Sequence, residues 1–117
     1  MSLVLYHNPR CTKSRQALKL LEDRGLKPRI VLYLESPPAA AEIKRLMKLL
    51  GLSPRQLMRA KEPLYKELGL DNPGLSERDL IGAMAENPIL IERPILVSGT
   101  HAVIGRPPER ILEIVGD

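Results

Sequence analysis

The chain has 117 residues, which is the size of one ordinary domain and leaves no room for a second. Its hydrophobic fraction of 44% is typical of a globular domain, so we expect a real core. The net charge of +4 favours anionic partners, but the absence of Phe and Trp argues against a protein that stacks single-stranded nucleic acid on aromatic rings. The charge by itself leaves duplex binding through phosphates open.

The sequence contains one cysteine, Cys11, and two histidines, His7 and His101. That set excludes an intramolecular disulfide and a zinc site built from several cysteines, so we predict no metal centre and no bound cofactor. No segment approaches the roughly 18 to 20 apolar residues of a membrane span. Residues 1–9 lack the ordered charged and apolar regions of a signal peptide. We therefore expect a cytoplasmic protein that does not contact a membrane.

The first 34 residues predict a strand, a helix and a second strand. Residues 2–6 are a short apolar run that ends at Asn8-Pro9, as a buried strand leading into a turn does. A helix is expected over about residues 11–24, because its apolar residues fall on one stripe and Gly25 provides a stop signal. Residues 29–34 are again almost continuously apolar, which indicates a strand covered on both faces. This opening predicts a right-handed parallel β-α-β unit.

After residue 34 the apolar residues recur with the period of a helix, and Ser36 is the candidate cap of the next predicted helix. The expected helical segments lie at residues 36–51, 53–59, 63–68 and 76–85. The last of these begins with a loose capping box at Ser76. Residues 94–97 and 102–104 predict a β-hairpin with a tight loop that contains Gly99, and a closing helix follows over 107–115.

This order of elements predicts an α/β fold in a single domain over residues 1–117. The sheet would be mixed and thioredoxin-like, with its middle connection replaced by a helical subdomain at about residues 36–88. That subdomain is inserted between the N-terminal β-α-β unit and the C-terminal β-β-α unit.

Cys11 lies where the first loop becomes the first helix, so its sulfur would face backbone N–H groups and the positive end of the helix dipole. An ordinary thiol, with a pKa of about 8.5, is only about 3% ionised at pH 7. If the pKa is lowered by about two units, roughly three quarters of the thiol is thiolate. We therefore interpret Cys11 as a nucleophile, with a buried structural cysteine as the alternative.

Three basic residues, Arg10, Lys13 and Arg15, crowd the first turn of this helix, which is the unfavourable end for cations. A bound oxyanion would offset that cost, whereas solvated side chains that point away are the alternative. His7 either positions or deprotonates the thiol, or it only caps the loop.

Three further arginines stand out by their context. Arg93 interrupts an apolar stretch directly before Pro94, Arg106 lies at the start of the closing helix, and Arg59 lies in a basic segment. Each could be an ordinary surface side chain. A planar guanidinium nevertheless suits a tetrahedral oxyanion better than an ammonium group does, so all three are candidate ligands of such an anion.

The spacing around the cysteine excludes other kinds of site. A phosphatase loop of the form C-x5-R would need an arginine where Ala17 stands, and a redox C-x-x-C pair would need a cysteine where Ser14 stands. The sequence also contains no Walker loop, dinucleotide glycine pattern or metalloprotease motif.

The segment from Tyr6 to Arg15, YHNPRCTKSR, resembles the active-site loop of the glutaredoxin-dependent arsenate reductases, whose pattern is close to Y-H-N-P-x-C-x-x-S-R. Later blocks resemble the same family in the same order, so the resemblance covers nearly the whole chain. Those blocks are VLYLESPP (31–38), LMRAKEPLYKELGL (57–70), NPILIERPILV (87–97) and IGRPPE (104–109). In length the chain is similar to a shorter branch of the family, without the longer C-terminal tail of the plasmid enzymes.

The resemblance implies a thioredoxin-like fold with a helical insertion and a catalytic role for Cys11. It also implies that Arg59, Arg93 and Arg106 bind and orient arsenate and arsenite. The supporting residues that it implies are His7, Asn8, Ser14, Arg15 and Pro94, the last of which follows a cis peptide bond in the family.

The function expected from these observations is the thiol-dependent reduction of arsenate to arsenite. The Cys11 thiolate would attack arsenate or a similar small oxyanion, and glutathione would supply the next thiol because the chain has no second cysteine. Glutaredoxin would then resolve the mixed disulfide, as the family implies. One alternative is a glutathione-linked reductase of another oxidised thiol or oxyanion. Another is a regulator of the same fold that binds RNA polymerase, although Ser14 replaces its second sensor cysteine. We expect a monomer that does not bind nucleic acid.

Overall fold

The computed structural model describes residues 2–115 of the chain. By the contacts within the chain, these residues form two compact units. The first, which we call the sheet unit, comprises Met1–Ser36 and Arg93–Asp117, and the second, the helical unit, comprises Pro37–Glu92. Each unit is described separately below.

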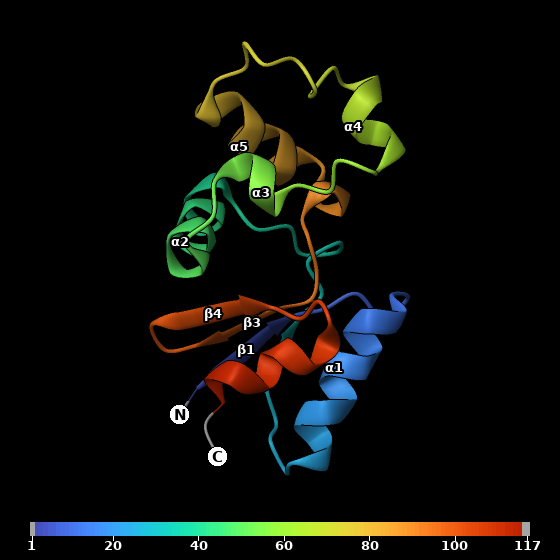
Figure 1. The fold of residues 1–117 in the computed structure, drawn as a ribbon, viewed down its shortest axis with the longest axis vertical. Helices are drawn as coiled ribbons and strands as arrows, with labels where there is room; N and C mark the ends of the chain where they lie inside the picture. Colours follow the sequence, from blue (N-terminus) through green and yellow to red (C-terminus); the bar gives the residue numbers. More distant parts are fainter. Residues whose placement is uncertain (1, 116–117) are drawn as a thin grey trace. The chain divides into compact units, whose positions relative to one another are not determined.

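The sheet unit contains four strands in the order β2-β1-β3-β4. They are β1 (Leu3–Tyr6), β2 (Arg29–Val31), β3 (Ile95–Ser98) and β4 (His101–Ile104). β1 runs parallel to β2 and antiparallel to β3, and β3 and β4 form an antiparallel hairpin. The predicted mixed, thioredoxin-like α/β fold is therefore confirmed (Figure 1).

Two helical elements cover the sheet, α1 (Thr12–Asp23) and η2 (Pro108–Ile114), and they pack against each other. Their buried side chains meet those of the strands in one apolar core. The core residues are Leu5, Ala17, Leu21, Leu96, Val103 and Ile111, all at most 5% exposed. Because Leu5 on β1 and Ala17 on α1 share this core, the loop between β1 and α1 is fixed at both ends.

Two predicted elements of the sheet unit differ from the observed ones. The second strand ends at Val31 rather than Leu34, because the Leu32 carbonyl accepts hydrogen bonds from the N–H groups of Glu35 and Ser36 and so closes a turn. The closing segment is present, but it is a 3-10 helix that begins at Pro108.

The helical unit contains four α-helices and a short 3-10 helix. They are α2 (Ala40–Leu50), α3 (Pro54–Leu57), α4 (Pro63–Glu67), α5 (Glu77–Glu86) and η1 (Pro88–Leu90). The predicted cap at Ser36 is wrong, since the N-cap of α2 is Ala39. The capping box at Ser76 is confirmed, and Ser53 begins α3 with another. α2 and α3 each pack against α5, so this unit has a core of its own.

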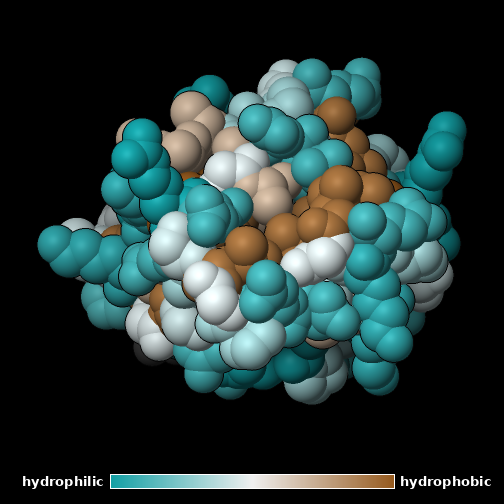
Figure 2. Space-filling view, turned by 90° about the horizontal axis from the view of Figure 1, so that it is seen from above, coloured by the Kyte–Doolittle hydropathy of each residue, from teal (hydrophilic) through white to brown (hydrophobic). Residues whose placement is uncertain are grey.

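The surface is mainly hydrophilic on the face drawn in Figure 2, where a band of hydrophobic residues runs between the polar ones. Among the residues of the helical unit, Leu68 and Ile89 have the most exposed large apolar side chains, at 47% and 38%. Within residues 2–115 no helix is long and apolar enough to cross a membrane.

Candidate active site

Cys11 is the N-cap residue of α1, as the sequence predicts, and its backbone is extended with φ of −92° and ψ of 122°. A tight turn over residues 8–11 places Cys11 at the start of α1. The Cys11 N–H donates to the Asn8 carbonyl at 3.0 Å, and the Asn8 side-chain oxygen accepts from the Arg10 N–H at 3.0 Å. The Cys11 residue is only 9% exposed. The thiol therefore lies in a fixed position at the positive end of the helix.

His7 and Ser14 form a buried pair beneath this turn, at 6% and 0% exposure. The His7 Nδ1 and the Ser14 Oγ are 2.6 Å apart, and Ser14 Oγ also accepts a hydrogen bond from the Asn8 N–H at 3.1 Å. Burial, assisted by the nearby positive charge of Arg15, lowers the pKa of His7. The surroundings therefore favour the neutral form of His7, and its contact with Ser14 supports the loop that carries the thiol.

Arg15 folds back over the same loop. Its Nη1 donates to the Pro9 carbonyl at 3.0 Å, and its Nη2 donates to the Thr12 hydroxyl at 3.4 Å. The other two basic residues of the first turn, Arg10 and Lys13, are exposed. The three cations are thus not equivalent, because Arg15 ties the ends of the loop together while the other two face solvent.

The pKa of Cys11 is lowered overall, although burial acts in the opposite direction and raises it. The backbone N–H groups of Ser14 and Lys13 and the guanidinium groups of Arg93 and Arg106 outweigh that desolvation. The sulfur makes no capping hydrogen bond of standard geometry, so the amides act on it through their dipoles. The electrostatic surroundings therefore favour the thiolate.

Arg93 and Arg106 both belong to the sheet unit and are connected through the main chain. The Nε–H of Arg106 donates to the carbonyl of Arg93 at 2.8 Å. The Arg93–Pro94 peptide bond is cis, as the resemblance implied, and the Arg106–Pro107 bond is cis as well. The two arginines are 13 positions apart in the sequence, and the structure brings both close enough to Cys11 to lower its thiol pKa.

Gly105 is a residue of this region that the sequence reasoning missed. Its N–H donates to the Pro94 carbonyl at 2.9 Å. A Cβ at this position would lie 3.0 Å from the Pro94 ring and 3.0 Å from the Ile111 side chain, which is tighter than ordinary packing allows. The position of Gly105 beside Arg106 in the GRPP segment was the only signal that the sequence offered.

Arg59 lies in the helical unit, directly after α3, and its contacts there are with acids and a carbonyl group. Its Nη1 is 2.9 Å from the Glu62 carboxylate and donates to the Ile89 carbonyl at 3.3 Å. Its Nε is 3.8 Å from the Glu92 carboxylate. All three side chains are between 19% and 28% exposed. The charge of Arg59 is thus largely balanced within its own unit.

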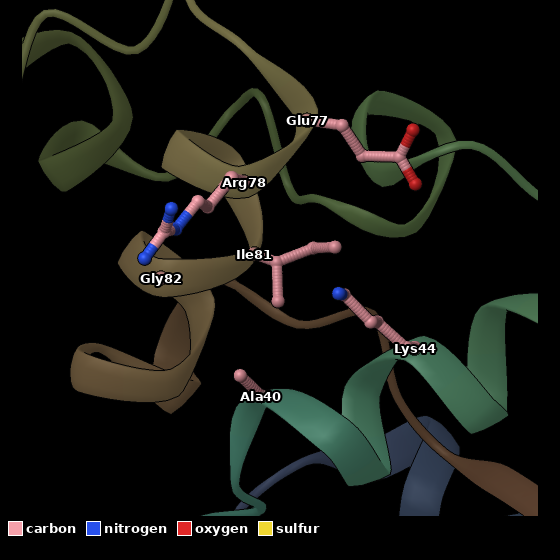
Figure 3. A pocket seen from close by; sticks show the side chains of 6 residues that line it. All are labelled: Ala40, Lys44, Glu77, Arg78, Ile81 and Gly82. Carbon is pink, nitrogen blue, oxygen red and sulfur yellow. The ribbon is translucent and has the colours of Figure 1, made fainter.

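A cavity of about 660 Å³ lies in the helical unit between α2 and α5 (Figure 3). Its floor is Ile81, and Lys44 points toward it from α2. None of the predicted site residues lines it. The sheet unit has a smaller cavity of about 280 Å³, lined in part by the loop from His7 to Arg10. Among residues 2–115, no three His, Cys, Asp or Glu side chains gather as metal ligands.

The fold and these residues define a class of protein: a thioredoxin-like domain with one thiol whose ionised form is favoured by helix amides and two guanidinium groups. The ArsC family model matches residues 6–114. The chain therefore belongs to the ArsC family.

Relatives support this assignment along the whole chain. An "Arsenate reductase" of Haemophilus influenzae is 50% identical over 116 residues, which are 98% of this chain and 100% of that protein. The protein YfgD of Escherichia coli K12 is 58% identical over 113 residues, covering 96% of this chain and 95% of that protein. A solved structure, "Arsenate reductase from Vibrio cholerae", is 54% identical, covers 98% of both chains and superposes with a TM-score of 0.96.

Proposed function

We propose that this chain reduces arsenate to arsenite, with the thiolate of Cys11 as the nucleophile. The observation that carries the proposal is the position of Cys11 at the N-cap of α1, where Arg93 and Arg106 are near enough to lower its thiol pKa. A site with two cations beside an ionised sulfur can hold a small oxyanion and supply its attacking group. The names of the relatives, arsenate reductases at about half identity, point to arsenate as that oxyanion.

The first step joins sulfur to arsenic. The Cys11 thiolate attacks arsenate, an S–As bond forms, and one arsenate oxygen leaves as water after taking up protons from the solvent. The oxidation state of arsenic is unchanged at this stage. The thiolate and arsenate are both anions, so their repulsion is the main obstacle to the attack. The positive charges of Arg93 and Arg106 reduce that repulsion.

The second step transfers the two electrons. The chain has no other cysteine, so the second thiol comes from outside, and we propose that glutathione provides it. Its sulfur attacks Cys11 Sγ, the S–S bond forms as the S–As bond breaks, and arsenic leaves as arsenite with both electrons. Glutaredoxin then reduces the mixed disulfide and restores the Cys11 thiol, so each cycle consumes two reducing equivalents.

Arg59 is proposed as a further contributor to arsenate binding. The support is the resemblance of residues 57–70 to the corresponding block of the family, together with the exposed fraction of 23% that its side chain retains. Its carboxylate partners reduce its net charge, so we expect a smaller contribution from Arg59 than from Arg93.

A coupled assay tests the proposal, with arsenite formation followed while glutathione and glutaredoxin are omitted in turn. We expect turnover only when both are present. A glutathionylated peptide serves as the competing substrate. Efficient reduction of the peptide without measurable arsenate turnover would assign the same thiol to a glutathione-linked reductase of another oxidised thiol. Arsenate turnover that continues without glutathione would contradict the external-thiol step.

A further inference from the structure

The turn that follows β4 binds two consecutive carbonyl groups of the segment that precedes β3. Arg106 donates from its side-chain Nε to the carbonyl of Arg93 at 2.8 Å, and Gly105 donates from its backbone N–H to the carbonyl of Pro94 at 2.9 Å. Two consecutive residues thus hold two consecutive peptide units that are more than ten positions away in the sequence. A hydrogen bond from a charged donor is stronger than a neutral one, so the Arg106 contact is the stronger of the pair.

Packing holds the same segment from the other side. Pro94 is fully buried, and it lies so close to Gly105 that a methyl group on Gly105 would press against its ring at 3.0 Å. With both carbonyls bonded and the proline ring enclosed, the backbone of Arg93 has little freedom to rotate. The direction in which the Arg93 side chain leaves the backbone is fixed as a result.

We propose that Arg106 is a positioning residue for Arg93, and that its Nε–H bond to the Arg93 carbonyl keeps the Arg93 guanidinium beside the thiol of Cys11. This inference extends the proposed function, because it explains how one of the two cations of the site is oriented. Arg106 then has two separate effects on the sulfur: the direct effect of its own charge and an indirect effect through Arg93.

The electrostatics of Cys11 agree with this division. Arg93 lowers the pKa of Cys11 more strongly than Arg106 does. We therefore expect that moving the Arg93 guanidinium well away from the sulfur raises the pKa of Cys11 more than removing the charge of Arg106 does. The attraction between a cation and a thiolate falls as the distance between them grows, and at a buried sulfur it is screened less than in water. Movement of the Arg93 guanidinium is therefore expected to be visible in the ionisation of the thiol.

Two substitutions separate the direct effect from the indirect one. In Arg106→Lys the positive charge stays, but a methylene group takes the place of Nε, so the donor to the Arg93 carbonyl is lost at that position. In Arg106→Gln the charge is lost, but the side-chain amide nitrogen takes the place of Nε and can still donate. The first variant therefore tests the positioning role, and the second tests the charge.

The readout is the pH dependence of Cys11 alkylation by iodoacetamide, a neutral reagent that reacts with the thiolate. It needs neither arsenate nor glutathione, so it stays informative even if the proposed function fails. We expect Arg106→Lys to slow alkylation at neutral pH by about threefold or more, through a higher thiol pKa, and Arg106→Gln to slow it less. Arg110→Lys is the matched control, because Arg110 pairs with Glu113 on the surface of η2. In this variant Cys11 should be alkylated at the wild-type rate.

A double-mutant cycle with Arg93→Ala completes the test. If Arg106 acts through Arg93, then Arg106→Lys should change the alkylation rate by less than about 1.5-fold in the Arg93→Ala background, where nothing remains to be positioned. A wild-type rate for Arg106→Lys in the native background overturns the inference. So does an effect of Arg106→Lys that persists at full size without Arg93.

Unfolding in urea shows whether each variant is folded at the assay temperature. Should Arg106→Lys not fold, Arg106→Met replaces it, since it also lacks the donor, and it is compared with Arg106→Gln, which lacks the same charge. A rate for Arg106→Met equal to that for Arg106→Gln would then contradict the positioning role. Arsenate kinetics follow last. If the alkylation rates agree with the expected double-mutant cycle of Arg106→Lys and Arg93→Ala but arsenate is not reduced, only the proposed function is wrong.

Discussion

The sheet unit and the helical unit use the same side chain, arginine, in different ways. In the sheet unit, the guanidinium groups of Arg93 and Arg106 both lower the pKa of Cys11. In the helical unit, Arg59 contacts Glu62 and Glu92. Positive charge is therefore directed at a nucleophile in one unit and largely balanced locally in the other.

Arg55 shows the structural use of arginine in the helical unit most clearly. Its Nη1 donates to the Tyr65 hydroxyl at 2.7 Å and to the Leu70 carbonyl at 2.8 Å, and its Nη2 donates to the Asn72 carbonyl at 2.7 Å. These bonds tie α3 to α4 and to the segment that follows α4. A guanidinium with three acceptors on other segments acts as a cross-link within this unit.

The largest expected effect concerns the thiol itself. Cys11→Ser removes the nucleophile, while a hydroxyl of similar size stays at the N-cap of α1, so the fold should persist. We expect kcat/KM for arsenate to fall by at least about a thousandfold in the glutathione and glutaredoxin assay. Circular dichroism and urea unfolding provide the control for folding. Arsenate reduction that survives in this variant would remove Cys11 from the mechanism.

The second prediction compares one arginine from each unit. We expect Arg93→Ala to lower kcat/KM for arsenate by about a hundredfold, because a cation that favours the Cys11 thiolate is lost, and Arg59→Ala by about tenfold. Arg59→Ala also leaves Glu62 without its closest cation, which should lower the free energy of unfolding by about 1 kcal/mol. Equal losses of activity in the two variants would contradict the difference drawn between the units, and retention within twofold in Arg93→Ala would end its proposed role.

A third prediction isolates the structural arginine. Arg55→Ala removes three hydrogen bonds, of which those to Tyr65 and Leu70 are partly buried, so the free energy of unfolding should fall by about 2 kcal/mol. We expect kcat/KM at a temperature where the variant is folded to stay within twofold of the wild type. Tyr65→Phe is the matched partial variant, because it removes only one of the three acceptors. A large loss of activity in a folded Arg55→Ala protein would show that the helical unit takes part in catalysis through this cross-link.

The elements that local patterns specify were predictable from the sequence. The apolar runs of β1 and β3, the helical stripe of α1 and the position of Cys11 at the start of that helix all depend on neighbours within a few residues. The end of β2 was not predictable, since the turn at Leu32 depends on which N–H groups its carbonyl meets. Sequence reasoning selected Arg93 and Arg106 by their neighbouring prolines, but the bond from one to the carbonyl of the other forms only when β3 and β4 pair.

The smallest predicted effect is the link between thiol ionisation and stability. The pKa of Cys11 is lowered in the folded chain, so between that pKa and the ordinary value of about 8.5 the unfolded state binds more protons than the folded state. The free energy of unfolding therefore rises with pH across this interval, and the contribution is lost as the pH falls through the folded pKa. Each unit of lowering corresponds to about 1.4 kcal/mol.

Urea unfolding of the reduced protein and of Cys11→Ser, measured from pH 5 to 9 in steps of about half a unit, isolates this contribution, because every other titrating group is common to both. We expect the free energy of unfolding of the wild type to increase relative to that of Cys11→Ser as the pH rises. The same experiment in the Arg93→Ala background should show a smaller slope, since one of the cations that lowers the pKa is gone. A difference that does not vary with pH would mean that Cys11 ionises equally in the folded and unfolded chains, and the distinction between a unit whose arginines activate a thiol and a unit whose arginines are held by local contacts would lose its basis.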